Sequence, residues 1–225
     1  MQPHPSLIFE ECSLEHASPE MMDRFWSLGW RHFGTEFFRY SLSFNEHGQQ
    51  TIQPLRIDLK RFVPSKSQRR VLRRNAELEV RFVPASLHRR VCEMFQKHKG
   101  RFTFNVPNDL RDFLGDPPGQ LIPCWECQVW QGREMVAASF METSRTAVSS
   151  VYGLFDLAQS SRSLGIFTLL MEIDYGIRQG LDFLYSGYAT LEPSHYDYKK
   201  KFAGLEIYDW AQGKWVAEGA ENDNA

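Results

Sequence analysis

The pattern of apolar and polar positions along the chain predicts alternating helices and strands. Apolar residues recur at helical spacing in some stretches and alternate, or run together briefly, in others. The predicted helices span residues 18–28, 65–75, 86–98, 163–179 and 194–203. The predicted strands span residues 37–44, 51–59, 77–82, 125–130, 134–143, 147–155, 183–188, 205–210 and 214–217. We therefore predict an α+β fold.

Turn-forming residues refine this prediction. Serines at 18, 65 and 86 are expected to cap the helices that follow them. Gly48 indicates a hairpin loop, and Pro54 predicts an edge position or a bulge for the strand that contains it. Residues 105–120, rich in proline and glycine, are expected to form a long loop able to close over a site.

Residues 64–75 read PSKSQRRVLRRN and predict a short basic helix. Ser65 and Gln68 have the spacing of a capping box. Five cations cover most of its surface: Lys66, Arg69, Arg70, Arg73 and Arg74. No acidic residue lies between positions 61 and 76 to neutralise them. A solvated basic face and a polyanion contact are both consistent with this pattern, and we favour contact with RNA phosphates.

The net charge of -2 conceals a strong asymmetry along the chain. Between Arg56 and Arg101 lie 14 basic and four acidic residues, whereas the remainder is acidic. This distribution favours one localised polyanion site. The first residues lack the basic and apolar segments of a signal peptide, and four cysteines suit a reducing compartment. We expect a cytoplasmic monomer with no membrane partner.

Residues 64–75 resemble the P-S-[KR]-S-x-[RK]-[RK]-V-[LM]-[RK]-[RK]-N signature of the arginyl-tRNA–protein transferase family, which includes bacterial leucyl-transferring members. The segments GWRHFG at 29–34 and SSVY at 149–152 resemble the same family, as does RSLG at 162–165. The resemblance implies a GNAT-like acyltransferase fold in the C-terminal part, residues 76–225. A smaller N-terminal α/β subdomain, residues 1–75, would complete a Fem/GNAT-type duplicated architecture.

The family resemblance also implies an activity. An aminoacyl-tRNA–protein transferase moves an amino acid, arginine by default, from aminoacyl-tRNA to the α-amine of an acceptor, by default an N-terminal Asp or Glu tagged as an N-degron. Ala189, where relatives usually have Trp, and the pair 195–196, where relatives usually have Lys-Met, suggest a different pocket. Three alternatives therefore remain: a leucyl-transferring member, a tRNA-dependent ligase acting on a peptide or natural product, and an inactive tRNA-binding module.

The resemblance places candidate functional residues at matching positions of this chain. The candidates that orient the amine or the aminoacyl group are Asp156, Tyr152 and Tyr188. The candidate substrate-binding residues are Arg162, Ser163, Gly165, Gly187, His195, Tyr198 and Lys199. The cations at 66, 69, 70, 73 and 74 are the candidate tRNA contacts.

No cofactor is expected besides the aminoacyl-tRNA co-substrate. Relatives commonly have N-terminal cysteine pairs that bind a metal or an iron–sulfur cluster, but here only Cys12 precedes residue 92. Such sites need several ligands, so we expect neither a cluster nor a metal. Cys124 and Cys127 form a CxxC without a second pair. Phe167, two residues after Gly165, is bulky where CoA-binding relatives of this fold have a small residue, so no CoA is expected.

Overall fold

The computed structural model describes residues 7–45, 48–102, 106–194 and 196–218. The helices are α1 (Pro19–Ser27), α2 (Lys66–Arg74), α3 (Arg89–Lys99), α4 (Arg111–Leu114) and α5 (Leu164–Arg178), with 3₁₀ helices η1 (Leu157–Arg162) and η2 (Asp197–Lys201). The strands are β1 (Phe9–Ser13), β2 (Arg31–Phe33), β3 (Glu36–Tyr40), β4 (Leu42–Asn45), β5 (Gly48–Asp58), β6 (Glu79–Pro84), β7 (Cys124–Gln131), β8 (Glu134–Thr143), β9 (Ala147–Phe155), β10 (Phe183–Thr190), β11 (Leu205–Asp209) and β12 (Lys214–Ala217).

Most of these strands form one large mixed sheet. Within the described residues its order is β12-β11-β5-β10-β9-β8-β7-β6, and β4 pairs with β5 beside this path. The order places β5, from the predicted N-terminal domain, between β11 and β10 of the predicted C-terminal domain. A separate small sheet has the order β1-β3-β2. The predicted α+β class is confirmed.

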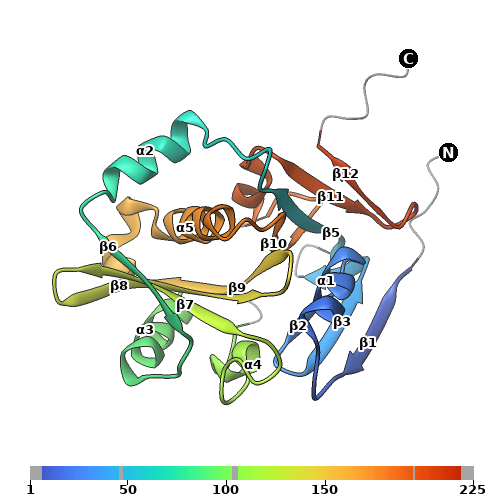
Figure 1. The fold of residues 1–225 in the computed structure, drawn as a ribbon, viewed down its shortest axis with the longest axis horizontal. Coiled ribbons are helices and arrows are strands. Elements are labelled where there is room, and N and C mark those ends of the chain that lie inside the picture. Colours follow the sequence, from blue (N-terminus) through green and yellow to red (C-terminus); the bar gives the residue numbers. More distant parts are fainter. Residues whose placement is uncertain (1–6, 46–47, 103–105, 195, 219–225) are drawn as a thin grey trace.

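Helices cover both faces of the large sheet (Figure 1). Helices α5 and α2 lie over one face, where Ile173 and Leu170 of α5 pack with Val71 of α2 and with sheet residues. Helices α3 and α4 lie on the opposite face, where Phe95 and Leu114 pack against β8 and β9. The small sheet and α1 stand at one end, with Trp26 and Phe37 buried between them. Burial on two faces explains the apolar character of β8, whose residues are buried from Met135 to Glu142.

The predicted caps of α1 and α2 are confirmed. Ser18 Oγ accepts a hydrogen bond from the Met21 amide. At α2, Ser65 Oγ accepts from the Gln68 amide, and the Ser65 amide donates to Gln68 Oε1 at 2.8 Å, which completes the capping box. The prediction for the third helix was wrong in its start: α3 is capped by the His88 imidazole, not by Ser86.

Three further predictions needed correction. The predicted strand 37–44 is two strands, because its first half pairs with β1 and β2 while its second half pairs with β5. The predicted helix 194–203 is only the 3₁₀ helix η2. The strand containing Pro54 is internal rather than at an edge, since β5 pairs with β10 and β11. Pro54 is tolerated there because it lies one residue beyond the stretch of β5 that pairs with β11.

No helix among the described residues is long and apolar enough to cross a membrane. The predicted long loop of residues 105–120 contains the short helix α4 in its described part.

Candidate functional site

The candidate site lies where β9 and β10 separate. The two strands pair in parallel over only Ala147–Ser149 and Phe183–Tyr185, although both continue for several more residues. Beyond this point β10 keeps pairing with β5, and a bulge follows Tyr185. A cavity of about 740 Å³ opens between the diverging strands, the start of α5, β2 and η2.

Arg31 of β2 reaches from the small sheet onto the floor of this cavity. Its Nη1 donates to Ser149 Oγ at 2.9 Å, and its Nη2 donates to the Ser150 carbonyl at 2.8 Å. The residue is 8% exposed. Burial lowers the pKa of the Arg31 guanidinium, but arginine stays charged in proteins. A fixed positive charge therefore lies where β9 leaves β10.

Lys199 of η2 lies beside Arg31. Its Nζ donates to the Ser186 carbonyl at 2.7 Å. A Cβ atom at Gly187 would lie 3.3 Å from Lys199 Nζ and 3.5 Å from Arg31 Nη2. Gly187 has a φ of +93°, in the region that favours glycine. Burial, and then the nearby Arg31, lower the pKa of Lys199 to about 7, while Glu172 opposes this effect.

Glu172 of α5 is the third charged residue of the floor. It is fully buried, and neither carboxylate oxygen has a hydrogen-bond partner among the described residues. Burial raises the pKa of Glu172 to about 7, although nearby serine hydroxyls, Lys199 and Arg31 favour the charged form. A carboxyl group with this pKa exchanges protons readily near neutral pH, which is the requirement for a general base.

Aromatic side chains form the walls of the cavity. They are Phe33, Phe38, Tyr40, Phe102, Phe113, Tyr152, Phe155, Tyr188, Tyr196 and Tyr198. Burial raises the pKa values of Tyr152 and Tyr198 to about 12, so both phenols are neutral hydrogen-bond donors. The Tyr188 hydroxyl instead donates to the Gly29 carbonyl at 2.7 Å, which ties β10 to the link between α1 and β2. Tyr152 is thus a candidate for substrate contact, whereas the Tyr188 hydroxyl has a structural partner.

The start of α5 opens into the same cavity. Ser163, Gly165 and Ile166 line it, and Ser163 precedes the helix in a left-handed conformation with no side-chain cap. The first amides of a helix favour an anionic or polar ligand. Phe167 is 4% exposed and packs in the core, so its bulk does not occupy the helix N-terminus. The size of Phe167 therefore gives no structural argument about CoA, and its exclusion stays a prediction.

Two predicted site residues lie outside the cavity. Asp156 is exposed and caps η1, where its Oδ1 accepts from the Ala158 amide at 3.0 Å. Arg162 pairs with Glu77 at 2.6 Å and also donates to the Arg74 carbonyl. Its position makes Arg162 a link between α2 and α5. His195 lies outside the described residues.

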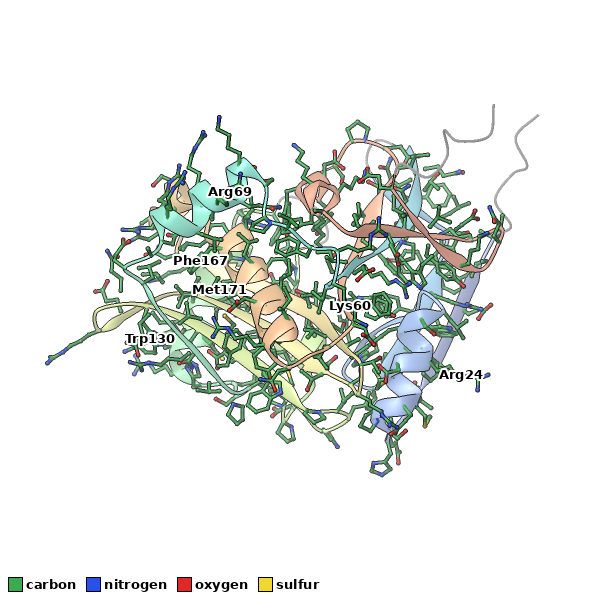
Figure 2. All side chains as sticks on the ribbon, turned by 45° about the horizontal axis from the view of Figure 1, so that its top comes forward. Arg24, Lys60, Arg69, Trp130, Phe167 and Met171 are labelled. Carbon is green, nitrogen blue, oxygen red and sulfur yellow. The ribbon has the colours of Figure 1, made fainter. Side chains whose placement is uncertain are left out.

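The five basic residues of α2 form an exposed surface that we call the α2 basic surface: Lys66, Arg69, Arg70, Arg73 and Arg74. None of them forms an ion pair with another described residue, and Glu77, the first acidic residue after the helix, pairs with Arg162. Figure 2 shows Arg69 on the outer side of α2, away from the sheet. The inner side is fixed by the buried Val71 and by Gln68, whose side-chain amide donates to the Lys201 carbonyl.

The cysteines form no candidate redox or metal site. Cys124 and Cys127 of β7 are buried and form no disulfide, and burial raises the pKa values of both thiols. Protonated, buried thiols are poor nucleophiles and ligands. In the parts of the chain that the structure describes, no group of three His, Cys, Asp or Glu residues could hold a metal ion.

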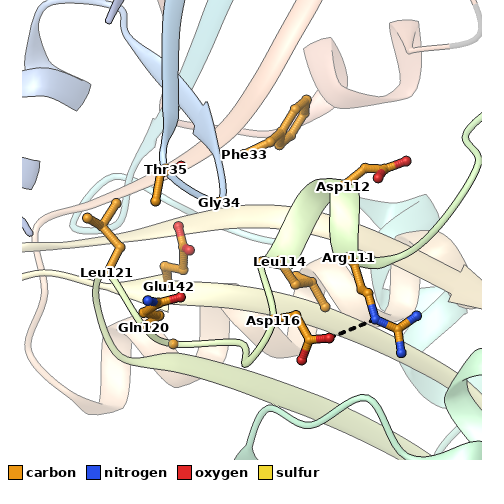
Figure 3. A pocket seen from close by; sticks show the side chains of 12 residues that line it. Phe33, Gly34, Thr35, Arg111, Asp112, Leu114, Asp116, Gln120, Leu121 and Glu142 are labelled. Atoms are coloured by element: carbon orange, nitrogen blue, oxygen red, sulfur yellow. Dashed lines mark hydrogen bonds and ion pairs between the residues drawn. The ribbon is translucent and has the colours of Figure 1, made fainter. Parts of the chain in front are cut away.

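A second, smaller cavity of about 280 Å³ lies between the β2–β3 turn and α4 (Figure 3). Most of its ionic groups are paired, and Asp112 accepts a hydrogen bond from the Asp109 amide. Arg111 Nε donates to Asp116 Oδ2 at 2.9 Å, and Glu142 lies 2.7 Å from His32 Nε2. Although burial alone would lower it, the pKa of His32 is raised by Glu142. We interpret this cavity as part of the contact between the small sheet and the body.

Sequence reasoning missed Arg31 and Glu172. The signal for Glu172 was its position in α5, because it follows Thr168 and precedes Gly176 at four-residue spacing on a buried face. A carboxylate on an otherwise buried helix face indicates function. Arg31 lies in the GWRHFG segment that carried part of the resemblance, yet only the fold shows that it reaches β9.

Comparison with known proteins identifies the family of the chain. Residues 84–209, more than half of the chain, match the family described as "Arginine-tRNA-protein transferase, C terminus". The chain belongs to this family. It is therefore a tRNA-dependent aminoacyltransferase, as the sequence resemblance predicted. The matched region includes α5, β10 and η2, and so two of the three charged residues of the cavity floor.

Several bacterial relatives share one name, aspartate/glutamate leucyltransferase. The protein of Xylella fastidiosa (strain M23) is 33% identical over 168 residues, covering 69% of this chain and 65% of that one. The protein of Marinobacter nauticus is 26% identical over 206 residues, covering 89% and 83%. The protein of Stenotrophomonas maltophilia (strain K279a) is 28% identical over 176 residues, covering 71% and 67%.

Comparison with solved structures matches "The structure of L-PGS from Bacillus licheniformis", with a TM-score of 0.44 and 14% identity, covering 78% of this chain and 52% of that one. The C-terminal domain of a lysylphosphatidylglycerol synthetase from Agrobacterium fabrum gives a TM-score of 0.46 and 13% identity, covering 81% and 55%.

Proposed function

We propose that this transferase moves leucine from leucyl-tRNA to the α-amine of an acceptor protein that begins with Asp or Glu. The names of the bacterial relatives favour leucine over the default of arginine that the family name suggested. The same names support an acidic acceptor residue, and hence N-degron tagging.

The chemistry of the cavity is the observation that carries this proposal. Its walls are largely aromatic, and its floor has two basic residues, Arg31 and Lys199, against the single carboxylate of Glu172. Arg101 also lines the cavity, so an arginyl side chain would add a further basic group to a space that is already basic, at a high desolvation cost. A leucyl side chain requires only apolar contact, which the aromatic walls offer.

In the proposed reaction the acceptor amine attacks the ester carbonyl of leucyl-tRNA. A C–N bond forms, the C–O bond to the terminal ribose breaks, and free tRNA leaves. We assign Glu172 as the base that takes the ammonium proton, because its pKa of about 7 is close to that of an α-amine, about 7.7–8.0. The neutral phenol of Tyr152 is a candidate donor to the tetrahedral oxyanion.

The proposed path of the tRNA joins α2 to the cavity. The α2 basic surface would hold acceptor-stem phosphates, and the free amides at the start of α5 would receive the 3′ end. The two elements are directly linked, since Arg162 and Asn75 connect the end of α2 to the residues before α5. Diverging β9 and β10 beside a helix N-terminus support a GNAT-like arrangement of this site. We propose that no CoA, metal or cluster takes part.

A direct test is incubation of the protein with separately labelled aminoacyl-tRNAs and peptides that begin with different residues. We expect the mass increment of one leucyl residue on peptides that begin with Asp or Glu. Transfer of arginine instead would refute the assignment of leucine. Binding of tRNA without any product would favour the inactive tRNA-binding module.

A further inference from the structure

We propose that Arg31 and Lys199, converging on Gly187, bind the side-chain carboxylate of the acceptor's first residue and thereby select Asp and Glu. This inference rests on the proposed function, because it assigns a role to residues of the same cavity. The space next to the Gly187 Cα, where a larger residue would have its Cβ, we call the Gly187 cradle.

The geometry of the Gly187 cradle suits a carboxylate. Lys199 Nζ and Arg31 Nη2 both lie within 3.5 Å of the single point that a Cβ would occupy. Charge-assisted hydrogen bonds to carboxylates span about 2.7–2.9 Å, so one carboxylate near this point can contact both nitrogens. Arg31, Gly187 and Lys199 all line the cavity, so a ligand that enters it can reach the cradle.

Both cations retain hydrogen-bonding capacity. Arg31 has five N–H donors and the structure assigns two of its bonds, one to Ser149 Oγ and one to the Ser150 carbonyl. Lys199 has three donors and gives one to the Ser186 carbonyl. Every assigned partner is a neutral oxygen. The protein thus orients the two basic groups without pairing either of them with a carboxylate.

The charge of the site is incomplete without an anion. A buried arginine is normally paired with a carboxylate. Within the described parts of the chain, no carboxylate oxygen lies within ion-pair distance, 4.0 Å, of Arg31 or Lys199. Glu172 is near enough to influence both electrostatically, yet it carries at most one negative charge against two basic groups. A carboxylate from the ligand would supply the missing charge.

An N-terminal acidic residue matches this arrangement group by group. Its α-amine and its side-chain carboxylate lie a few bonds apart, and the floor presents a carboxylate, Glu172, near two basic groups. Lysine has a flexible stem, so Lys199 can follow the extra methylene that distinguishes Glu from Asp. The amides Asn and Gln have similar shapes but no charge. Peptides that begin with Asn or Gln should therefore leave Arg31 without an anionic partner.

The test compares the wild type with Lys199→Gln in transfer from labelled leucyl-tRNA to peptides that begin with Asp, Glu, Asn or Gln. We expect the wild type to prefer Asp over Asn. Removal of one partner from a buried charge pair should reduce this preference in kcat/KM by about 30-fold or more. The loss should appear mainly as a higher KM for the acidic peptides, with an unchanged KM for leucyl-tRNA.

Lys201→Gln is the matched control. It removes the same charge from the same 3₁₀ helix, but Lys201 is exposed and does not line the cavity. The Asp-to-Asn preference should stay at the wild-type value. Thermal melting of both variants checks their folding. If transfer by Lys199→Gln is too slow to measure, calorimetric titration with Asp-Ala and Asn-Ala peptides gives the same comparison without chemistry.

The outcomes separate this inference from the proposed function. If the wild type transfers a different amino acid to acidic N-termini, only the assignment of leucine is refuted. The comparison of Asp and Asn peptides then continues with the tRNA that carries that amino acid. Equal losses for Asp and Asn peptides in Lys199→Gln would overturn the inference, as would an unchanged preference. Weaker binding of leucyl-tRNA with an unchanged preference would instead assign the cradle to a phosphate of the tRNA end. A wild type without acceptor preference also overturns it.

Discussion

Replacement of Glu172 by Gln should reduce activity and increase stability, and the two effects should have different pH dependences. The substitution keeps the size of the side chain but removes its charge. Loss of a general base typically costs about 10²–10⁴-fold in rate. The wild-type profile of kcat should rise as Glu172 ionises near pH 7, and this limb should vanish in Glu172→Gln. The limb that belongs to the acceptor amine, near pH ~7.7–8.0, should remain.

The stability effect follows from the raised pKa. The pKa of Glu172 increases from 4.5 in the unfolded chain to about 7 in the fold. Its contribution to stability is therefore fully present below pH 4.5 and is lost as the pH rises through about 7. At about 1.4 kcal/mol per pH unit, the loss reaches about 3 kcal/mol by pH 8. Glu172→Gln avoids this loss.

The assay combines thermal melting and transfer kinetics between pH 5 and 8. For a chain of this size, 3 kcal/mol corresponds to a Tm increase of roughly 6–12 °C, expected at pH 8 and nearly absent at pH 5. Asp174→Asn on the same helix is the control, because Asp174 is partly exposed and pairs with Arg178. A Glu172→Gln variant that keeps the neutral limb of the profile, or that melts lower at pH 8, would refute the reasoning.

Three further expectations follow from the contacts around the site. Replacing Arg70 and Arg73 by Gln should leave thermal stability unchanged and weaken tRNA binding. It should also reduce the slope of log affinity against log salt by about one to two units. An unchanged slope in filter binding would exclude a role for these residues in tRNA binding. Asn75→Ala should cost about 2–3 kcal/mol in urea unfolding, because the buried amide donates to Val71 and Arg162 at 3.0 Å each. Purified protein should contain no stoichiometric metal or iron and should not bind CoA, as elemental analysis and calorimetry would show.

The sequence predicted most elements because their apolar spacing is local information. The capping box at Ser65 and Gln68 is complete within four residues, and it appears in the structure as expected. The cap of α3 was misassigned because His88 rarely takes that role, whereas Ser86 commonly does. The break at Ser41 was not visible, since β3 and β4 part only because they pair with different sheets.

The candidate site was only partly predictable, for a similar reason. Gly187 and Lys199 were identified through the family resemblance, and both line the cavity. Asp156 was also proposed, but the structure places it in the exposed cap of η1. The role of Arg31 depends on how the small sheet docks, which no local pattern encodes. The division into domains at residue 75 stays a prediction, although β5 and Arg31, both before it, contribute to the central sheet and the cavity.

The contacts at the end of α2 suggest how the proposed tRNA-binding surface and the proposed reaction cavity would act together. Asn75 is fully buried and holds the Arg162 carbonyl, while the Arg74 side chain donates to the Ser161 carbonyl. These bonds attach the last turn of α2 to the residues that precede α5, whose first turn lines the cavity. The spacing between the α2 basic surface and Glu172 is therefore fixed by rigid elements rather than by a loop. In the proposed complex, a fixed spacing would let phosphate contacts, which carry no information about the amino acid, position the ester for attack.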